Sequence, residues 1–174
     1  VLWSTVEKTA LADAEVEYMD HTSDTIYVSF TIQKSKLKNL LGAEVIIWTT
    51  TPWTIPANKA LAYNKSLKYV VTQVNDKGDF NNRKIIVAKD LLKSVVEDCK
   101  INDYKIISEI KGSDFDGVVC SHPFKNIGYN YDIPMLEASF VTTEQGSGIV
   151  HCAPSHGPDD FNLCLNNNIK ALET

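Results

Sequence analysis

Trp48-Thr-Thr-Thr-Pro-Trp-Thr-Ile-Pro-Ala-Asn58 directly follows the apolar run Val45-Ile46-Ile47, and three consecutive hydroxyl side chains interrupt that run. The two prolines of the stretch remove backbone donors and fix φ near about −65°, so the chain cannot continue as a central strand. The pattern predicts a buried strand that delivers three threonines to its end, and then a rigid loop that carries Trp53 past them. Because threonine is β-branched, each hydroxyl is a stiff donor and acceptor. A polar strand end followed by a proline-rich turn, without further function, is the alternative interpretation.

A second unusual stretch lies about 100 residues later and consists of Glu144-Gln-Gly-Ser-Gly-Ile-Val-His-Cys-Ala-Pro-Ser-His-Gly-Pro-Asp-Asp-Phe161. Gly146 and Gly148 are expected where the backbone approaches another segment closely or adopts positive φ. Residues 149–152 predict a short strand. Pro158 and the two acidic residues after it have the composition of a helix start.

The polar residues of this second stretch also have structural interpretations. Asp159 and Asp160 suit the first turn of a helix, where carboxylates stabilise the positive end of the dipole. His151 suits a hydrogen-bonded histidine within a strand. Cys152 beside it suggests a Cys–His nucleophile, but adjacent strand residues point to opposite faces and rarely pair. A metal site formed by His151, His156 and Asp160 is a further alternative, although it lacks the usual ligand pattern.

Most of the remaining sequence consists of short β-branched and aromatic segments separated by turn residues. Strands are expected over 26–32, 44–48, 69–74, 83–87, 104–111, 118–120, 136–141 and 149–152. Residues 75–79 predict the turn of a hairpin, and helices are expected only over 88–98 and from Pro158. This order favours a mixed α/β, β-rich fold, a closed or nearly closed β-barrel with a few decorating helices.

The composition of the whole chain limits its function class. With 174 residues, 44% of them hydrophobic and 22% charged, the chain is typical of one soluble globular domain. The net charge of −5 argues against a surface that grips many phosphates, but it permits a site for one end of a nucleic acid. The absence of a signal peptide, of a membrane-length apolar run and of C-x-x-C spacing predicts a cytoplasmic protein with reduced cysteines. The opening, which lacks a Met, suggests a piece of a larger protein.

The two unusual stretches together resemble isoleucyl-tRNA synthetase, a class I aminoacyl-tRNA synthetase. More narrowly, residues 48–58 and 146–160 are similar to the editing (CP1) domain that is inserted into the nucleotide-binding fold of that enzyme. Residues 3–18 resemble the ribbon that enters this insertion, whereas residues 75–130 carry no motif of the family. The Trp-Thr-Thr-Thr-Pro-Trp-Thr form differs from the valyl and leucyl enzymes, which carry an arginine-containing Thr-Thr-Arg-Pro sequence at this place.

The resemblance covers essentially the whole chain. It implies a single editing domain over 1–174, with an entering ribbon at about 1–18 and an exit towards the parent nucleotide-binding domain at about 168–174. The implied activity is post-transfer editing, which is hydrolysis of the ester of valine wrongly attached to isoleucine tRNA. Pre-transfer editing is a further option. Valine and isoleucine differ by one methylene, worth only ~1–3 kcal/mol, and the isoleucyl enzyme is itself the usual example of this limit. A second, size-selective pocket supplies the missing accuracy, because a close-packed wall does not yield to an extra methylene.

The resemblance also implies partners and cofactors. The partners would be the 3′ end of aminoacylated isoleucine tRNA, misactivated valine and the rest of the parent synthetase, without a membrane. No cofactor or metal is implied in this domain, and ATP would be used at the synthetic site of the parent enzyme. Three alternatives remain: a non-catalytic module that binds the charged tRNA end, a valyl-type domain that edits threonine, and a small metal-dependent hydrolase. The missing arginine after Thr50 argues against the valyl type.

Individual residues acquire roles from the resemblance. Thr49, Thr50 and Thr51 match the threonine-rich wall, which lines the pocket and hydrogen-bonds the ester and terminal adenosine of the substrate. Trp53 matches the tryptophan beside this wall, and Asn58 matches an asparagine implicated in editing, so the resemblance implies that both bind substrate.

The second stretch supplies the opposite wall. His151 matches the histidine that helps to exclude isoleucine, and Asp160 matches the carboxylate that binds the aminoacyl ammonium group. Asp159 is the nearest competitor, since an alignment slips easily at an Asp-Asp pair. With Thr51, His151 and Asp160 as candidate catalytic residues, the expected chemistry is ester hydrolysis by positioned water without an acyl-enzyme intermediate. His151, a threonine hydroxyl and the ribose hydroxyl of the tRNA all remain candidates to handle the proton.

Overall fold

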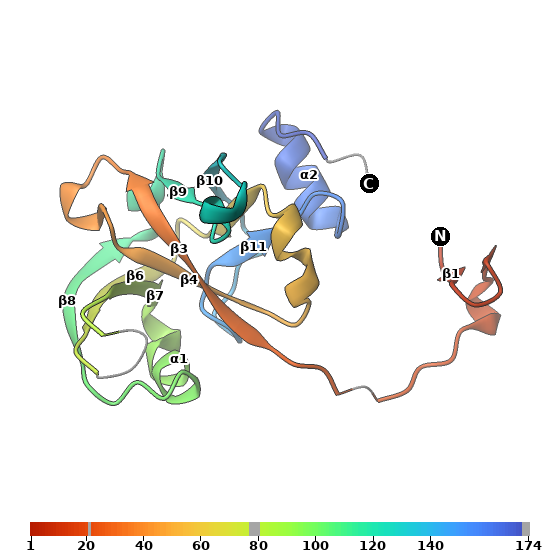
Figure 1. Ribbon diagram of the computed structural model, residues 1–174, viewed down its shortest axis with the longest axis horizontal. Helices are drawn as coiled ribbons and strands as arrows, with labels where there is room; N and C mark the ends of the chain where they lie inside the picture. Colours follow the sequence, from red (N-terminus) through yellow and green to blue (C-terminus); the bar gives the residue numbers. More distant parts are fainter. Residues whose placement is uncertain (21, 77–80, 172–174) are drawn as a thin grey trace.

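A computed structural model describes residues 1–20, 22–76 and 81–171. Within these ranges, nine strands form one sheet in the order β11-β5-β10-β9-β3-β4-β7-β6-β8 (Figure 1). Their bounds are β3 (Ile26–Lys34), β4 (Glu44–Thr49), β5 (Ala60–Tyr63), β6 (Lys68–Val74), β7 (Lys84–Ala88), β8 (Tyr104–Lys111), β9 (Val119–Ser121), β10 (Asp132–Glu137) and β11 (Val150–Cys152). Neighbouring strands are antiparallel, except that β4 pairs with β7 and β10 with β5 in parallel.

Helices are few and short, as expected. The two α-helices of the described chain are α1 (Leu92–Asp98) and α2 (Pro158–Asn166). Short 3-10 helices occur in the connections, namely η1 (Asp13–Glu15), η2 (Lys38–Leu40), η3 (Pro52–Ala57), η4 (Lys89–Leu91), η5 (Gly112–Phe115) and η6 (Lys125–Ile127). A small hairpin of β1 (Trp3–Ser4) and β2 (Thr9–Ala10) forms its own two-stranded sheet (Figure 1). None of the helices in the described ranges has the length and apolar character needed to cross a membrane.

The expectation of a closed or nearly closed barrel is not confirmed. The strand order ends at β11 and β8, and no ladder between these two edge strands is found in the part of the chain that the structure describes. The end of β7 nevertheless contacts the segment before β11, because the amide of Ala88 donates to the carbonyl of Ser147 at 2.8 Å. In that segment, Gly146 and Gly148 have φ of +79° and +75°, which lie in the left-handed region rather than the extended one. The mixed, β-rich fold class is confirmed.

One strand assignment was displaced. The strand expected over 136–141 is wrong beyond Glu137, because β10 occupies residues 132–137 instead. Pro134 lies inside this strand, where a proline is unexpected since it lacks the backbone donor of a continuous ladder. The strand changes partner at this residue, however, with 132–134 paired to β9 and 135–137 paired to β5.

The hairpin expected around residues 75–79 is present as the antiparallel pair β6–β7. Of its turn, residues 77–79 lie outside the described residues. The final three residues of the expected exit segment, 172–174, lie outside them as well. The four cysteines are all free: Cys99 is half-buried, and Cys120, Cys152 and Cys164 are buried.

Apolar residues cover both faces of the central strands. Along β4, Val45 and Ile47 belong to the largest buried cluster, whereas Ile46 belongs to the cluster beneath α1. A third cluster joins β5 and β11 to α2 through Cys152 and Cys164. Because successive strand residues point to opposite faces, this alternation buries β4 between two apolar layers. The apolar run before the threonines is therefore a fully buried strand, as predicted.

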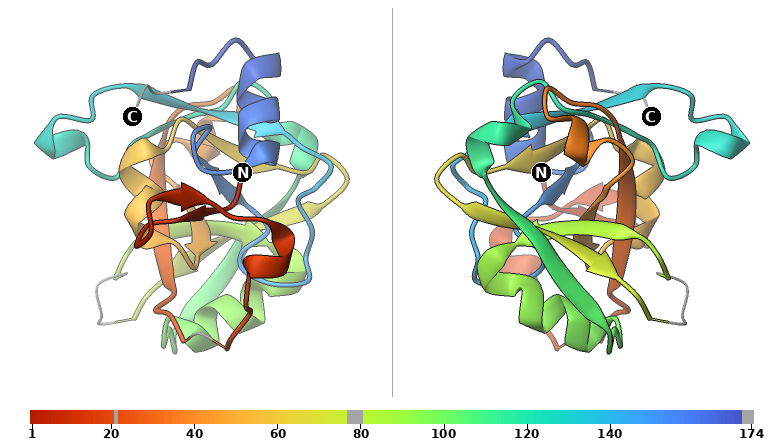
Figure 2. Two further views of the ribbon diagram at one scale, coloured as in Figure 1. Left: turned by 90° about the vertical axis from the view of Figure 1, so that its right-hand side faces the viewer. Right: turned by 90° about the vertical axis from the view of Figure 1, so that its left-hand side faces the viewer.

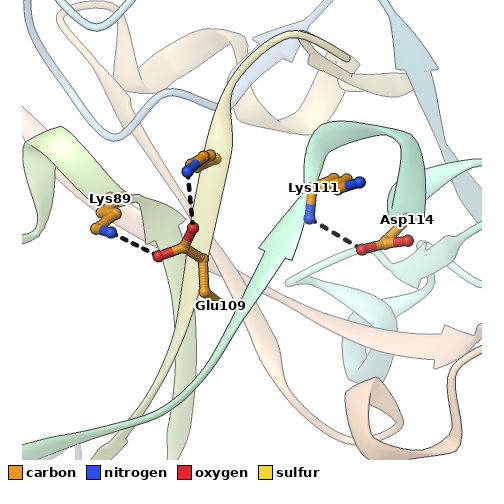
Figure 3. A network of polar contacts seen from close by, with 5 residues as sticks. Lys89, Glu109, Lys111 and Asp114 are labelled. Atoms are coloured by element: carbon orange, nitrogen blue, oxygen red, sulfur yellow. Dashed lines mark hydrogen bonds and ion pairs between the residues drawn. The ribbon is translucent and has the colours of Figure 1, made fainter.

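A small network of polar contacts lies on the edge strand β8 (Figure 3). The carboxylate of Glu109 accepts a hydrogen bond from Lys89 at 2.6 Å and lies 3.3 Å from the ammonium group of Lys68. These two cations hold the pKa of Glu109 below its usual range. Nearby, the backbone amide of Lys111 donates to Asp114 at 2.9 Å and caps η5. Since the ion pairs are exposed to water, they contribute little to the stability of the fold.

Two glycines with the same φ test how much the approach of the loop before β11 to β7 matters. A Cβ atom at Gly148 (φ +75°) would lie 2.3 Å from the Cβ of Ala88, whereas a Cβ atom at Gly42 (φ +76°) would meet nothing within 4 Å. We expect Gly42→Ala to lower the free energy of unfolding by about 1–2 kcal/mol through backbone strain. Gly148→Ala should lower the free energy of unfolding by roughly 1–3 kcal/mol more than Gly42→Ala does, because the added methyl group also overpacks its site. Urea denaturation measures both values, and equal losses would contradict the close contact.

Candidate functional site

One cavity of about 590 Å³ lies between the end of β4, the segment before and along β11, and the start of α2. Figure 1 shows η3, coloured gold, near β11 and α2. The cavity brings together both unusual stretches of the sequence. The predicted site residues that line it are Thr49, Thr50, Thr51, Trp53, His151 and Asp160, together with Asp159. Asn58 is the predicted site residue that does not line it.

The threonine wall has a buried and an exposed part. Thr49 is the last residue of β4 and is buried, and its Oγ1 accepts a hydrogen bond from the backbone amide of Thr51 at 3.1 Å. The hydroxyl of Thr51 lies 3.2 Å from the hydroxyl of Thr49, while Thr50 and Thr51 are both exposed. Trp53 is 69% exposed, so its indole stands at the rim of the cavity and is available for a flat partner. The wall therefore presents hydroxyl groups that hydrogen bonds already orient.

Thr54 also belongs to the site, although it is not among the site residues predicted from the sequence. It is buried, lines the cavity and donates its hydroxyl proton to the carbonyl of Thr51 at 2.8 Å. Its Oγ1 also lies 2.9 Å from Nε2 of His151. The sequence nevertheless contains an indication of this position. A 3-10 helix has about three residues per turn, so side chains three residues apart lie on the same side of it, and Thr54 lies beside Thr51. Recognising it required the prediction that the proline-rich loop is helical.

His151 is held by hydrogen bonds at both ring nitrogens. In addition to the contact with Thr54, its Nδ1 lies 2.6 Å from Nδ2 of Asn58. The side chain is only 8% exposed, and burial, with smaller contributions from His122 and His156, lowers its pKa from 6.5 to about 4. His151 is therefore neutral at neutral pH.

Asn58 lies behind the cavity wall. Its side chain is completely buried, and Nδ2 donates to the carbonyl of Ala60 at 2.9 Å as well as contacting His151. The resemblance implies that Asn58 binds substrate, whereas the structure places its side chain where it contacts the site through His151.

Asp160 and Asp159 occupy different environments at the start of α2. Asp160 is half-buried, and one carboxylate oxygen accepts a hydrogen bond from the backbone amide of Ala153 at 3.0 Å. Burial is the main cause that raises the pKa of Asp160 above its ordinary value. Asp159 is exposed. Of the two, Asp160 is the carboxylate with a fixed orientation, because it ties α2 to the end of β11.

Cys152 lies on the other face of β11 from His151. It is fully buried in the cluster beneath α2, and burial raises the pKa of its thiol well above the usual range. A Cys–His nucleophile is therefore not formed, as the strand alternation predicted. Among the described residues, no group of three His, Cys, Asp or Glu side chains is arranged to hold a metal ion, so geometry lends no support to a site of His151, His156 and Asp160.

The loop between β9 and β10 supports η3 from outside the cavity, although its sequence carries no motif of the family. His122 donates from Nε2 to the carbonyl of Ile55 at 3.0 Å, and its ring stacks on Tyr129. The hydroxyl of Tyr131 lies 3.1 Å from the carbonyl of Asn58, to which it donates. Figure 2 shows this loop extending from the body of the domain. It holds the backbone that carries Thr54 and Asn58.

The low pKa of His151 makes the stability of the fold depend on pH. The ring is expected to titrate near 6.5 in the unfolded chain and near 4 in the folded one. Stability from the neutral ring is thus complete above pH 6.5 and is lost as pH falls towards 4. Between pH 7 and pH 4, the free energy of unfolding should fall by roughly 3 kcal/mol more in wild type than in His151→Gln. Urea denaturation across this range measures the loss; His122, whose pKa is also lowered by burial, is common to both proteins. An equal loss of stability in wild type and in His151→Gln would contradict the lowered pKa of His151.

Comparison with known proteins connects this site to one enzyme family. No family model matches the chain. Isoleucine–tRNA ligase of Pelagibacter ubique (strain HTCC1062) is 68% identical over 174 residues, which cover 100% of this chain and 19% of that protein. Isoleucine–tRNA ligase of Gluconobacter oxydans (strain 621H) is 46% identical over 179 residues, covering 99% of this chain and 19% of that protein. The chain spans about a fifth of the length of these curated relatives.

Solved structures share the fold at low sequence identity. The crystal structure titled GlLeuRS-CP1 has a TM-score of 0.61 and 20% identity, covering 82% of this chain and 61% of that one. The cytosolic leucyl-tRNA synthetase editing domain of P. knowlesi has a TM-score of 0.64 and 16% identity, covering 82% of this chain and 60% of that one. The chain therefore belongs to the isoleucine–tRNA ligase family, in which it corresponds to one segment with the fold of a synthetase editing domain.

Proposed function

We propose that this chain hydrolyses valine from mischarged isoleucine tRNA, as the editing domain of an isoleucyl-tRNA synthetase. The observation that carries this proposal is the cavity in which the threonine end of β4 faces His151 and Asp160. Its volume of about 590 Å³ falls within the usual range of small-molecule sites, about 300–1,000 Å³. Sequence similarity to isoleucine–tRNA ligases supports the identity of the tRNA, and the polar lining supports an aminoacyl ester as the ligand.

Each wall of the cavity has a proposed role in binding. The carboxylate of Asp160 receives the ammonium group of the amino acid in a charge-assisted hydrogen bond. The hydroxyls of Thr49, Thr50 and Thr51 hold the ester and the terminal adenosine, and the exposed indole of Trp53 offers a face for the base. The buried ring of His151 limits the length of the aliphatic side chain, which admits valine and rejects isoleucine.

The proposed reaction is attack of water on the ester carbonyl. The water oxygen bonds to the carbonyl carbon, the bond from that carbon to the ribose oxygen breaks, and the ribose oxygen takes up a proton. Positioning and hydrogen bonds to the polarised carbonyl supply the rate, because an ester is an activated substrate. With both nitrogens of His151 already hydrogen-bonded, the Thr51 hydroxyl and the ribose hydroxyl of the tRNA are the better candidates to handle the proton.

The setting of this reaction is part of the same proposal. The domain needs no cofactor, and ATP serves the synthetic site elsewhere in the parent synthetase. The rest of that synthetase is the structural partner, the aminoacylated 3′ end of isoleucine tRNA is the nucleic-acid partner, and the cytoplasm is the location. Valyl-adenylate, the product of misactivation, is expected to enter the same cavity for editing before transfer.

The two neighbouring aspartates provide a matched test. We expect Asp160→Ala to reduce deacylation of valyl-tRNA by on the order of 100-fold, because the substrate ammonium group loses its charged partner. Asp159→Ala, which changes an exposed carboxylate one residue away, should remain close to wild type. Deacylation is measured in the parent synthetase and, at high substrate concentration, in the 174-residue chain. Wild-type turnover in Asp160→Ala would sink the assignment, and the wild-type chain binding the charged tRNA without hydrolysis would favour a purely binding module.

Selectivity tests the role of His151. Removing the ring in His151→Ala should let the cavity accept isoleucyl-tRNA, so that deacylation of the isoleucyl ester rises at least about 10-fold relative to wild type. Valyl, isoleucyl and threonyl esters are compared in the same assay. A preference of the wild-type protein for the threonyl ester would instead indicate a valyl-type domain.

A further inference from the structure

We propose that Asn58 and Thr54 are positioning residues that lock His151 in one neutral tautomer, with its proton on Nε2. In this arrangement both ring nitrogens are occupied within the protein, so the ring offers carbon surface rather than a basic nitrogen to the cavity. The functional consequence rests on the proposed editing reaction, whereas the tautomer itself rests only on the contacts of the described residues.

The side-chain amide of Asn58 has one orientation that fits its neighbours. Its Nδ2 lies 2.9 Å from the carbonyl oxygen of Ala60, and a carbonyl can only accept. The NH₂ group must therefore face Ala60, since the opposite orientation would place two acceptor oxygens together. The same NH₂ group lies 2.6 Å from Nδ1 of His151, so its second hydrogen is directed at that nitrogen. Nδ1 is consequently an acceptor without a proton.

The contact between Nε2 of His151 and Thr54 accounts for the proton of the neutral ring. A neutral imidazole carries one proton, and with Nδ1 as acceptor that proton is on Nε2. Nε2 lies 2.9 Å from Oγ1 of Thr54, which can accept because the hydroxyl proton of Thr54 is donated to the carbonyl of Thr51 at 2.8 Å. The chain of hydrogen bonds thus ends at a backbone carbonyl on both sides. Oγ1 of Thr54 also lies 3.4 Å from the hydroxyl of Thr51, which is a longer contact than the other two.

Reversing this chain is unfavourable at both ends. The other tautomer would direct Nδ1–H at the NH₂ group of Asn58, and Thr54 would have to donate to Nε2 and withdraw its proton from Thr51. Protonation of the ring creates the same conflict at Nδ1, which agrees with the lowered pKa of His151. The Oδ1 atom of Asn58 is buried and has no hydrogen-bond partner within the described residues. Its orientation is therefore maintained through its two N–H contacts alone.

His122 provides an internal reference for the experiment. Its Nε2 faces the carbonyl of Ile55 at 3.0 Å, and its Nδ1 accepts from the backbone amide of Phe124 at 3.0 Å. Backbone groups alone therefore assign His122 to the same Nε2–H tautomer. Substitutions at Asn58 and Thr54 leave these backbone groups in place, so the signals of His122 report whether the fold is intact.

The test is the nitrogen-15 spectrum of the histidine side chains at pH 7, recorded through two-bond proton–nitrogen correlation. In the labelled wild-type chain, His151, assigned by its loss in His151→Gln, should show an unprotonated Nδ1 and a protonated Nε2. Asn58→Asp replaces the donor by a carboxylate, and we expect it to move the proton of His151 to Nδ1 while His122 is unchanged. Thr54→Val, which removes the acceptor at Nε2, should give averaged signals, and Thr54→Ser should restore the wild-type pattern. An Nδ1–H or averaged ring in wild type, or an unchanged ring in Asn58→Asp, would overturn the proposal.

A kinetic measurement separates this proposal from the proposed function. In the parent synthetase, deacylation of valyl-tRNA by wild type should show no inflection from His151 between pH 6 and pH 8. Asn58→Asp should lower the ratio of kcat/KM for the valyl over the isoleucyl ester by about 10-fold, as the wall of the cavity shifts. If the nitrogen-15 pattern holds but wild type hydrolyses neither ester, the editing function fails and the tautomer assignment stands. If editing occurs with an inflection from His151, the tautomer lock is wrong and the editing function stands.

Discussion

The hydrogen bond between Thr54 and His151 joins two parts of the chain that are 97 residues apart, and the candidate site depends on it. On one side lies η3, which begins at Pro52 directly after the three consecutive threonines. On the other lies β11, which pairs with β5 only over three residues. A buried hydrogen bond between such segments is strong because water cannot replace either partner, and leaving either group unpaired would be costly. The position of the histidine ring relative to the threonine wall is therefore well defined.

The surrounding fold makes this contact possible through close backbone approach. The chain before β11 crosses the end of β7 at Gly148, where a side chain would overlap Ala88. From the other direction, the loop between β9 and β10 holds the carbonyls of η3 through His122 and Tyr131. At the far wall, the carboxylate of Asp160 fastens α2 to the amide of Ala153. Three separate supports thus hold three walls of one cavity, which suits a site that discriminates by size.

Much of the fold was predictable because local patterns were unambiguous. The apolar run of β4, the β-branched segments of β3 and β6, and the start of α2 at Pro158 all have short-range signals that match their structures. The strand over 132–137 was misplaced because Pro134 argues against a central strand, and only the change of pairing partner at that residue explains its place. Closure of the sheet into a barrel could not be decided from the sequence, since closure depends on long-range pairing that no single segment encodes.

The sequence by itself indicated most of the residues that line the candidate cavity, since the threonine stretch, His151 and Asp160 all stand out in its two unusual stretches. The tertiary structure decided how these residues are used. Asn58 lies behind the wall, Thr54 completes the contact with His151, and Asp160 rather than Asp159 is fixed. The reason is physical: residue type and spacing define which groups can donate, accept or carry charge. Burial and the direction of each hydrogen bond, by contrast, exist only once distant segments pack together.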